Sequence, residues 1–146
     1  MVQEAHGDML ITWIGNICLT QLNGPFNEEG SHICLLNFQH AWQQHGKPKR
    51  WAHVLDLQQW LGRTPECTPF IKEAMAWALT HGLSCAVAVM GSGSARILWD
   101  INQRVNPAFP SKIVSLLLCD DHQAAAQLLI QQGFDGAAYA KHTADS

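Results

Sequence analysis

An acid near the end of an expected strand has the strongest case for chemistry in this chain. Residues 51–57 are rich in strand-forming side chains, and Asp56 comes close to the end of that run. Ligands of open parallel sheets bind at the edge where the strands end. A helix that begins at the Thr-Pro-Glu sequence of residues 64–66 would add backbone donors at the same edge. The alternative is a structural acid that caps the following loop.

The residues after Asp56 extend this expected binding surface. Trp60 falls in an expected loop. It is either a lid folded onto the core or an exposed anchor for a partner, since tryptophan is enriched among interface hot spots. Thr64, Glu66 and Thr68 stand at the expected start of the next helix. With Asp56, these four residues make up the predicted partner- or ligand-binding set.

A second region of interest is the Gly-Ser-Gly-Ser sequence at residues 91–94, which follows a strand and precedes a helix, as an anion-binding loop does. Ser92, Gly93 and Ser94 would supply donors, and Arg96 would add a positive charge. The sequence lacks the third glycine of a dinucleotide-binding loop and the Gly-Lys-Ser/Thr of a P-loop. The alternative is a flexible turn in which a serine caps the helix.

The histidines and cysteines do not form a metal-binding or catalytic pattern. His40 and His45 are five residues apart, which places them on different sides of a helix. His53 and Asp56 are three residues apart and should lie on opposite faces of a strand. The five cysteines include no Cys-x-x-Cys pair, so we expect buried, unreactive thiols in a reducing compartment. We predict no metal, no cofactor and no catalytic residue.

Composition limits the class of protein. The chain has 146 residues, of which 47% are hydrophobic and 14% charged, and this fits one domain with a sizeable core. A net charge of −3 argues against a nucleic-acid partner. The N-terminal residues match neither a signal peptide nor a membrane-spanning helix. We therefore expect a cytoplasmic protein without a transmembrane segment.

Local patterns predict an alternating order of elements. Two short apolar runs separated by Gly15-Asn16 are typical of a β-hairpin. Asn27 is an expected helix cap, and strands and helices then alternate to about residue 132. The predicted order is ββαβαβαβα, an α/β domain over residues 1–135 with a five-stranded, mostly parallel sheet and four helices. We expect residues 136–146 to form a loose tail.

Several local sequences resemble those of bacterial members of the SpoIIAA-like superfamily, the STAS/SEC14-type domains. The sequences that support this resemblance are His-Gly-Asp at 6–8, Gly-Pro-Phe-Asn-Glu-Glu-Gly at 24–30, Val-Leu-Asp-Leu at 54–57, Thr-Pro-Glu at 64–66 and His-Gly at 81–82. The resemblance spans about residues 6 to 135. It implies a non-enzymatic module that binds partner proteins or small ligands.

In the anti-sigma-factor antagonists of this superfamily, a serine at the start of the helix after the third strand is phosphorylated to switch partner binding. This chain lacks the Asp-Ser-Ser-Gly sequence of that switch, and Thr64, Glu66 or Thr68 occupies its position. Phosphorylation is therefore expected at Thr64 or Thr68, if anywhere. The resemblance favours a protein-interaction or regulatory module that docks on another protein or on a second copy. The alternative is a carrier of a small apolar ligand, with an enzyme third.

Overall fold

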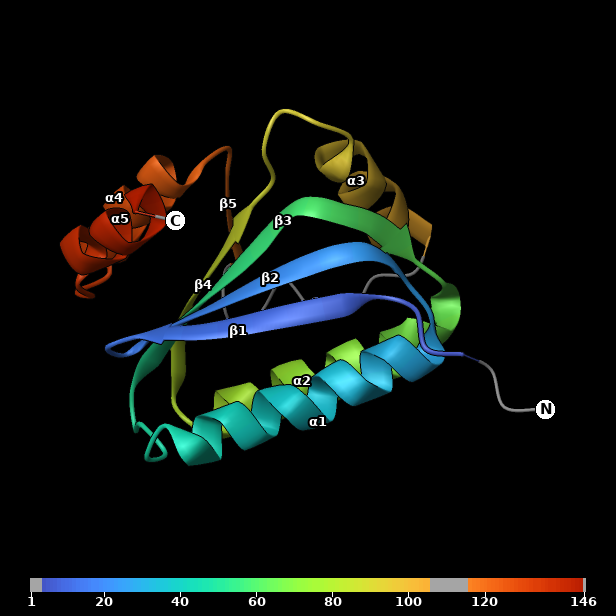
Figure 1. Cartoon of the computed structure of the whole chain (residues 1–146), viewed down its shortest axis with the longest axis horizontal. Coiled ribbons are helices and arrows are strands. Elements are labelled where there is room, and N and C mark those ends of the chain that lie inside the picture. The colour runs from blue at the N-terminus through green and yellow to red at the C-terminus, as the bar shows by residue number, and fades with distance from the viewer. Residues whose placement is uncertain (1–3, 106–115, 146) are drawn as a thin grey trace.

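A computed structural model describes residues 4–105 and 116–145 of the chain. These residues form one mixed sheet, in which five strands follow one another in chain order (Figure 1). The strands are β1 (Asp8–Ile14), β2 (Ile17–Phe26), β3 (Trp51–Arg63), β4 (Leu83–Val89) and β5 (Leu116–Cys119). β1 pairs antiparallel with β2, and the later pairs are parallel. The predicted α/β class, with an N-terminal hairpin and a mostly parallel sheet, is confirmed.

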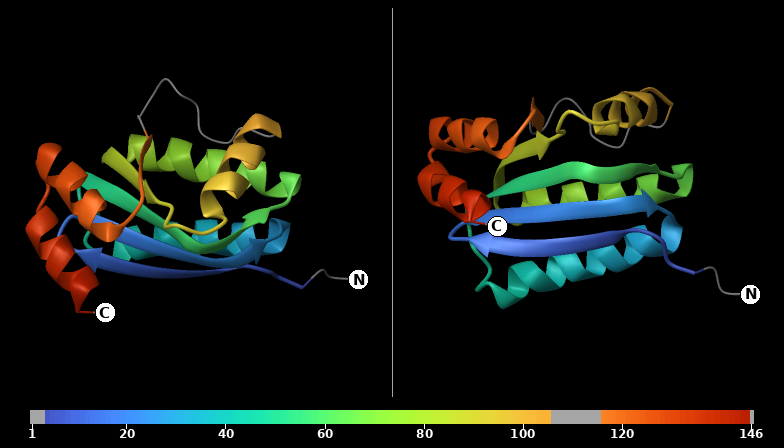
Figure 2. Two further views of the ribbon diagram at one scale, coloured as in Figure 1. Left: turned by 90° about the horizontal axis from the view of Figure 1, so that it is seen from above. Right: turned by 45° about the horizontal axis from the view of Figure 1, so that its top comes forward.

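Helices cover both faces of this sheet. Helices α1 (Glu28–Gln44) and α2 (Thr68–Thr80) lie side by side along one face, and a short 3-10 turn, η1 (Pro65–Cys67), leads into α2. Helices α4 (His122–Gln131) and α5 (Gly136–Ala144) pack against each other and the opposite face, toward the β1–β2 turn (Figure 2). Helix α3 (Ala95–Val105) contacts β3.

Strand β3 divides its side chains between the two helical layers. Trp51 packs with Phe38 on the side of α1 and α2, whereas Val54 belongs to the core shared with α4 and α5. This alternation follows from the two-residue period of a strand. His53 packs beside Phe38 and Asp56 contacts α4, so the two lie on opposite faces, as their spacing predicts.

One buried side chain fixes the entry into α1. The Asn27 Oδ1 atom accepts hydrogen bonds from the backbone N–H groups of His6 and Gly30, and its Nδ2 donates to the carbonyl of Glu4. A Cβ at position 30 would overlap the carbonyl oxygen of His6, so only glycine fits there. The Asn-Glu-Glu-Gly sequence therefore caps the helix and holds residues 4–6 against its start.

Strands β2 and β3 are longer than the sequence suggests. Residues 23–26 have an Asn-Gly-Pro-Phe sequence that is typical of a turn, but they continue β2 with shifts of register. Residues 58–63, expected as a loop, continue β3. Gly24 and Gly62 adopt φ values of 78° and 91°. Glycine takes these values without strain, so each strand bends there instead of ending.

Smaller differences affect two other elements. The helix expected from residue 64 begins as η1 and becomes α-helical at Thr68. The largely apolar run at residues 113–119 predicts the last strand. This strand is observed as β5 from Leu116, and residues 113–115 lie outside the described part of the chain.

The C-terminal residues form a helix, and the prediction of a loose tail was wrong. Asp135 caps α5 by accepting a hydrogen bond from the backbone N–H of Ala138, and Tyr139 is fully buried (0% exposed) in the core that includes Leu129 of α4. With α5, the described residues hold five α-helices instead of the predicted four. The sequence did not predict this helix because nine residues with a single large apolar side chain show no periodic stripe of apolar residues.

Candidate functional site

Two groups of side chains on opposite faces of the sheet are candidates for function. We name the first the polar network, which consists of Gln21, Asp56, Gln58, His122 and Tyr139. We name the second the apolar cavity, which lies between the sheet and the layer formed by α1 and α2. β3 contributes to both because its side chains alternate between the two faces.

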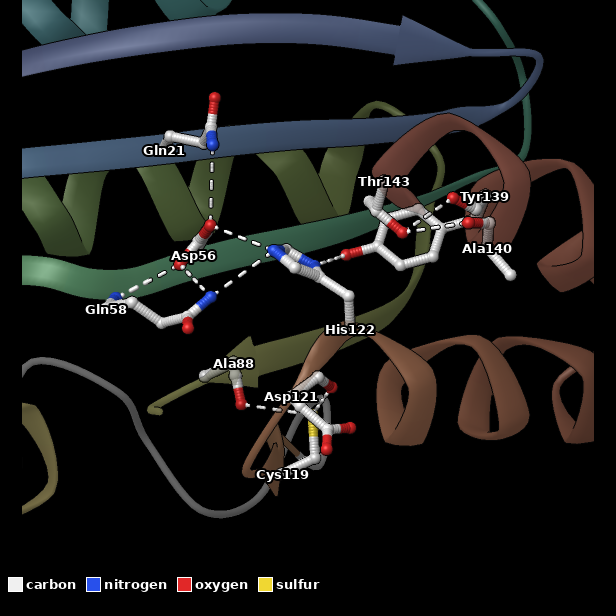
Figure 3. A network of polar contacts seen from close by, with 10 residues as sticks. All are labelled: Gln21, Asp56, Gln58, Ala88, Cys119, Asp121, His122, Tyr139, Ala140 and Thr143. Atoms are coloured by element: carbon white, nitrogen blue, oxygen red, sulfur yellow. Dashed lines mark hydrogen bonds and ion pairs between the residues drawn. The ribbon is translucent and has the colours of Figure 1, made fainter. Parts of the chain in front are cut away.

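Asp56 is the centre of the polar network and is only 7% exposed (Figure 3). Its Oδ1 accepts hydrogen bonds from the backbone and side-chain amides of Gln58, at 3.1 and 3.2 Å. Its Oδ2 lies 3.1 Å from Nε2 of His122 and 3.5 Å from the side-chain amide of Gln21. Both carboxylate oxygens are therefore satisfied within the protein.

His122 connects β3 to the two C-terminal helices. Its Nδ1 lies 2.5 Å from the hydroxyl of Tyr139 on α5. When a neutral imidazole donates its Nε2–H to Asp56, its Nδ1 accepts the O–H of Tyr139. Burial, and then the charge of Asp56, raise the pKa of Tyr139, so the phenol keeps its proton and remains the donor. This chain of hydrogen bonds holds α4 and α5 on the sheet.

The electrostatics of the network keep Asp56 ionised at neutral pH. Burial by itself would raise the pKa of this carboxyl group. The hydrogen bonds from His122 and Gln58 oppose burial and outweigh it, so the pKa of Asp56 lies below its usual value.

The network contains an Asp–His pair but does not present it to a substrate, because both ring nitrogens of His122 are used inside the protein. The thiol drawn in Figure 3, that of Cys119, lies with Sγ 3.6 Å from the carbonyl oxygen of Asp121. Burial, and then the charges of Asp121 and Asp120, raise the pKa of Cys119 to about 11. A thiol with that pKa is a poor nucleophile at neutral pH. The network therefore fits a structural role better than a catalytic one.

All five cysteines are free thiols. Four are buried, as the sequence predicts (Cys18, Cys67, Cys85 and Cys119), whereas Cys34 is only half-buried. Burial, with smaller contributions from Asp8 and Cys67, raises the pKa of Cys34 to about 11. Among the described residues, no three His, Cys, Asp or Glu side chains gather in a way that could hold a metal ion.

The apolar cavity is partly enclosed and has a volume of about 150 Å³. Side chains from β1 to β4 and from α1, α2 and α3 line it, and most are apolar. They include Leu22, Leu35, Leu55, Leu57, Ile71 and Trp99. The ring of Trp99 meets that of Trp60 edge-on, with centroids 6.4 Å apart.

A neutral polar pair lies in the sheet wall of this cavity. The Nε2 of His53 is 2.9 Å from Oγ1 of Thr20, and both residues line the cavity. The imidazole packs beside Phe38 with ring centroids 4.8 Å apart. Burial lowers the pKa of His53 to about 4. At neutral pH this pair offers hydrogen bonds to the cavity but no charge.

A charged group lies in the cavity wall where β3 ends. Arg63, the last residue of β3, lines the cavity, and its Nη1 donates a hydrogen bond of 2.6 Å to Oγ1 of Thr68. Thr68 is the first residue of α2 and is 6% exposed. The wall of the cavity is thus mostly apolar but includes the guanidinium group of Arg63.

The structure does not bring the predicted binding set together at one edge. Asp56 belongs to the face covered by α4, whereas the Thr-Pro-Glu turn begins after Arg63. Seven residues of β3 lie between Asp56 and Thr64, a span of up to roughly 25 Å in extended backbone. The expected rim formed by Asp56 and a helix start is therefore absent from the described structure, because β3 continues where a loop was expected.

The other members of that set divide between the core and the surface. Trp60 is 5% exposed and packs with Phe26, so it is the lid on the core and not the exposed anchor. Thr64 and Glu66 are exposed, whereas Thr68 is buried and bonded to Arg63. A kinase could reach the exposed Thr64 directly, but it could reach the buried Thr68 only after local unfolding. Of the two predicted phosphorylation sites, Thr64 is therefore the accessible one.

The Gly-Ser-Gly-Ser loop resembles a helix start more than an anion site. Ser92, Gly93 and Ser94 are exposed, and the carbonyl of Ser94 accepts a hydrogen bond from Leu98 in the first turn of α3. Arg96 pairs with the carboxylate of Asp120 at 3.0 Å, so its charge is offset. An anion in this loop would have to compete with Asp120.

Sequence reasoning missed four residues that define the two candidate sites. His122 and Tyr139 complete the polar network, and His53 and Arg63 supply the polar groups of the apolar cavity. One signal was present for His122, which follows two acidic residues between a strand and a helix, the second of which, Asp121, caps α4. No sequence signal placed the single tyrosine of the chain beside it, because the helix that positions Tyr139 was not predicted.

Comparison with known proteins gives little similarity. No family model and no curated protein matches the chain. One solved structure, a crystal structure of Mglu, aligns with 52% of this chain and 18% of its own chain, at 17% identity and a TM-score of 0.42. The chain therefore spans less than a fifth of Mglu. Each helix in the described part of the chain is too short or too polar to cross a membrane.

Proposed function

We propose that this protein binds a small, mainly apolar ligand in the apolar cavity. The observation that supports the proposal is the cavity itself, a space of about 150 Å³ between a sheet and two helices with a mostly apolar lining. Ligand sites in proteins have this character, an apolar wall with a few polar groups that fix orientation. Thr20 with His53, and Arg63 with Thr68, are such groups.

The volume limits the size of the ligand. A dry apolar cavity of about 150 Å³ in another protein accommodates benzene. The cavity described here has the same volume, so it suits a ligand, or the buried part of one, of about six carbon atoms. A whole phospholipid does not fit, which restricts the SEC14-type alternative to small molecules.

Filling the cavity should weaken ligand binding without unfolding the protein. Ala74 lines the cavity from α2, and we expect Ala74→Leu to weaken the binding of fluorobenzene by about tenfold or more, because the added carbons occupy the site. Ala76, two residues further along the same helix, is exposed and does not line the cavity, so Ala76→Leu is the matched control. Binding is measured by 19F NMR titration, and circular dichroism checks the fold.

The two variants separate cavity binding from binding elsewhere. If fluorobenzene binds both variants and the wild type equally, its site is not this cavity. If fluorobenzene does not bind the folded wild type at concentrations near 1 mM, the proposed function is wrong. A dissociation constant of about 1 mM corresponds to a binding free energy of about −4 kcal/mol.

Docking on a second copy of the chain is our second proposal, in line with the interaction role that the family resemblance implies. Ile97 and Ile101 are 65% and 49% exposed and lie one turn apart on α3, and we assign the self-association surface to this exposed apolar pair. We expect Ile97→Lys to weaken self-association by about tenfold in sedimentation velocity. Ile130→Lys, at an exposed position on α4, is the control. A wild type that stays monomeric at about 1 mM would contradict this proposal.

A further inference from the structure

We propose that the ligand of the apolar cavity is a small, uncharged hydroxyl compound, with an apolar body of about six carbons in the cavity and its hydroxyl group on the imidazole of His53. This inference depends on the proposed function and adds the chemical class of the ligand. Its basis is the Thr20–His53 pair in the sheet wall, which uses only one of the two ring nitrogens of His53.

Two neighbouring strands place this pair in the wall of the cavity. Thr20 of β2 and His53 of β3 both line the cavity, and Nε2 of His53 lies 2.9 Å from Oγ1 of Thr20. Phe38 of α1 packs beside the imidazole, with ring centroids 4.8 Å apart. The imidazole is therefore held both by a hydrogen bond from the sheet and by an aromatic contact from the helical layer.

The second ring nitrogen, Nδ1, is available to a ligand. In the part of the chain that the structure describes, the imidazole of His53 has no hydrogen bond other than that with Thr20. Nδ1 is also not one of the fully enclosed polar atoms that lack a partner, so it keeps some accessible surface. Because His53 lines the cavity, a molecule bound there lies beside this ring.

A hydroxyl group suits Nδ1 in either arrangement of the pair. If Nε2 of His53 accepts the O–H of Thr20, Nδ1 bears the ring proton and is a donor; if Nε2 donates to Thr20, Nδ1 is an acceptor. A ligand hydroxyl can accept in the first case and donate in the second. A methyl group in the same place can do neither.

The charges around the imidazole favour a neutral ligand group. Burial lowers the pKa of His53 to about 4, so the ring is uncharged at pH 7. A charged group placed on this ring would lose water without gaining an opposite charge from it. Among the described residues that line the cavity there is no Asp or Glu, so a cation would find no counter-charge there.

Phenol and toluene test the inference, because they have similar size and differ in one group. We expect phenol to bind the wild-type protein at pH 7 at least as tightly as toluene, measured by isothermal titration calorimetry. In the double variant Thr20→Val/His53→Leu, toluene should bind about tenfold more tightly than phenol, because the hydroxyl group then loses water without gaining a partner. The double change removes both members of the pair, so neither is left as an unpaired buried group.

His40→Leu is the matched control for the change of a histidine. His40 is exposed on α1 and does not line the cavity, so this variant should bind both ligands as the wild type does.

The outcomes separate this inference from the proposed function. If the wild type binds toluene more tightly than phenol, the hydroxyl assignment is overturned and the apolar site remains. If neither ligand binds the wild type, the proposed function fails as well. The comparison on the wild type decides between these outcomes even if the double variant does not fold. Phenol binding that still equals or exceeds toluene binding in the folded double variant would overturn the role of His53 and place the hydroxyl on another group, such as Ser31 of α1.

Discussion

Removal of residues 136–146 is expected to lower the free energy of unfolding by at least about 4 kcal/mol, or to prevent folding altogether. The deletion takes away Tyr139, which is fully buried in the core between the sheet and α4. Truncation of one large buried aromatic side chain costs about 3–5 kcal/mol by itself. The deletion also leaves Nδ1 of His122 without the hydroxyl that it contacts. Urea denaturation followed by circular dichroism measures the loss.

A shorter deletion provides the control for this experiment. Removing only residues 145 and 146 leaves α5 (Gly136–Ala144) intact, and the exposed Asp145 is the only described residue lost. We expect a change of less than about 0.5 kcal/mol. If the longer deletion has the same small effect, α5 does not contribute to the core as described.

Asp56→Asn is expected to lower the free energy of unfolding by about 2 kcal/mol at pH 7, because it removes the charge that receives hydrogen bonds from His122 and Gln58. The loss should depend on pH. The pKa of Asp56 in the folded protein lies below its ordinary value of 3.8. The ionised carboxylate therefore contributes its full stabilisation at pH values above 3.8. As the pH falls from 3.8 through the folded pKa, the wild type loses this contribution and the two proteins become alike.

Urea denaturation at pH 7, 5, 4 and 3 tests this expectation. The difference in unfolding free energy between wild type and Asp56→Asn should be constant from pH 7 to 5 and should shrink below pH 4. Asp100→Asn changes the same chemical group at an exposed position on α3 and should leave the profile unchanged. A difference that stays constant down to pH 3 would show that the ionised carboxylate does not stabilise the fold.

The order of the elements was predictable because its signals are local. The Gly15-Asn16 pair between two apolar runs marks the hairpin, and Asn27 marks a helix start that the structure confirms through a hydrogen bond from the backbone N–H of Gly30 to the Asn27 side chain. Such signals depend on a few consecutive residues. They fail where tertiary pairing overrides them, as at Gly24 and Gly62, where strands continue through residues that commonly end them.

The amino-acid sequence by itself therefore determined the α/β class, the hairpin, the alternation of strands and helices, and the opposite orientation of His53 and Asp56. Each of these follows from local periodicity and capping. Only the tertiary structure decided which side chains meet. Asp56 and His122 are 66 residues apart in the chain, and the apolar cavity exists because α1 and α2 leave space against the sheet. Contacts of this kind depend on how far each strand extends and how helices pack, and neither is encoded in a short stretch of residues.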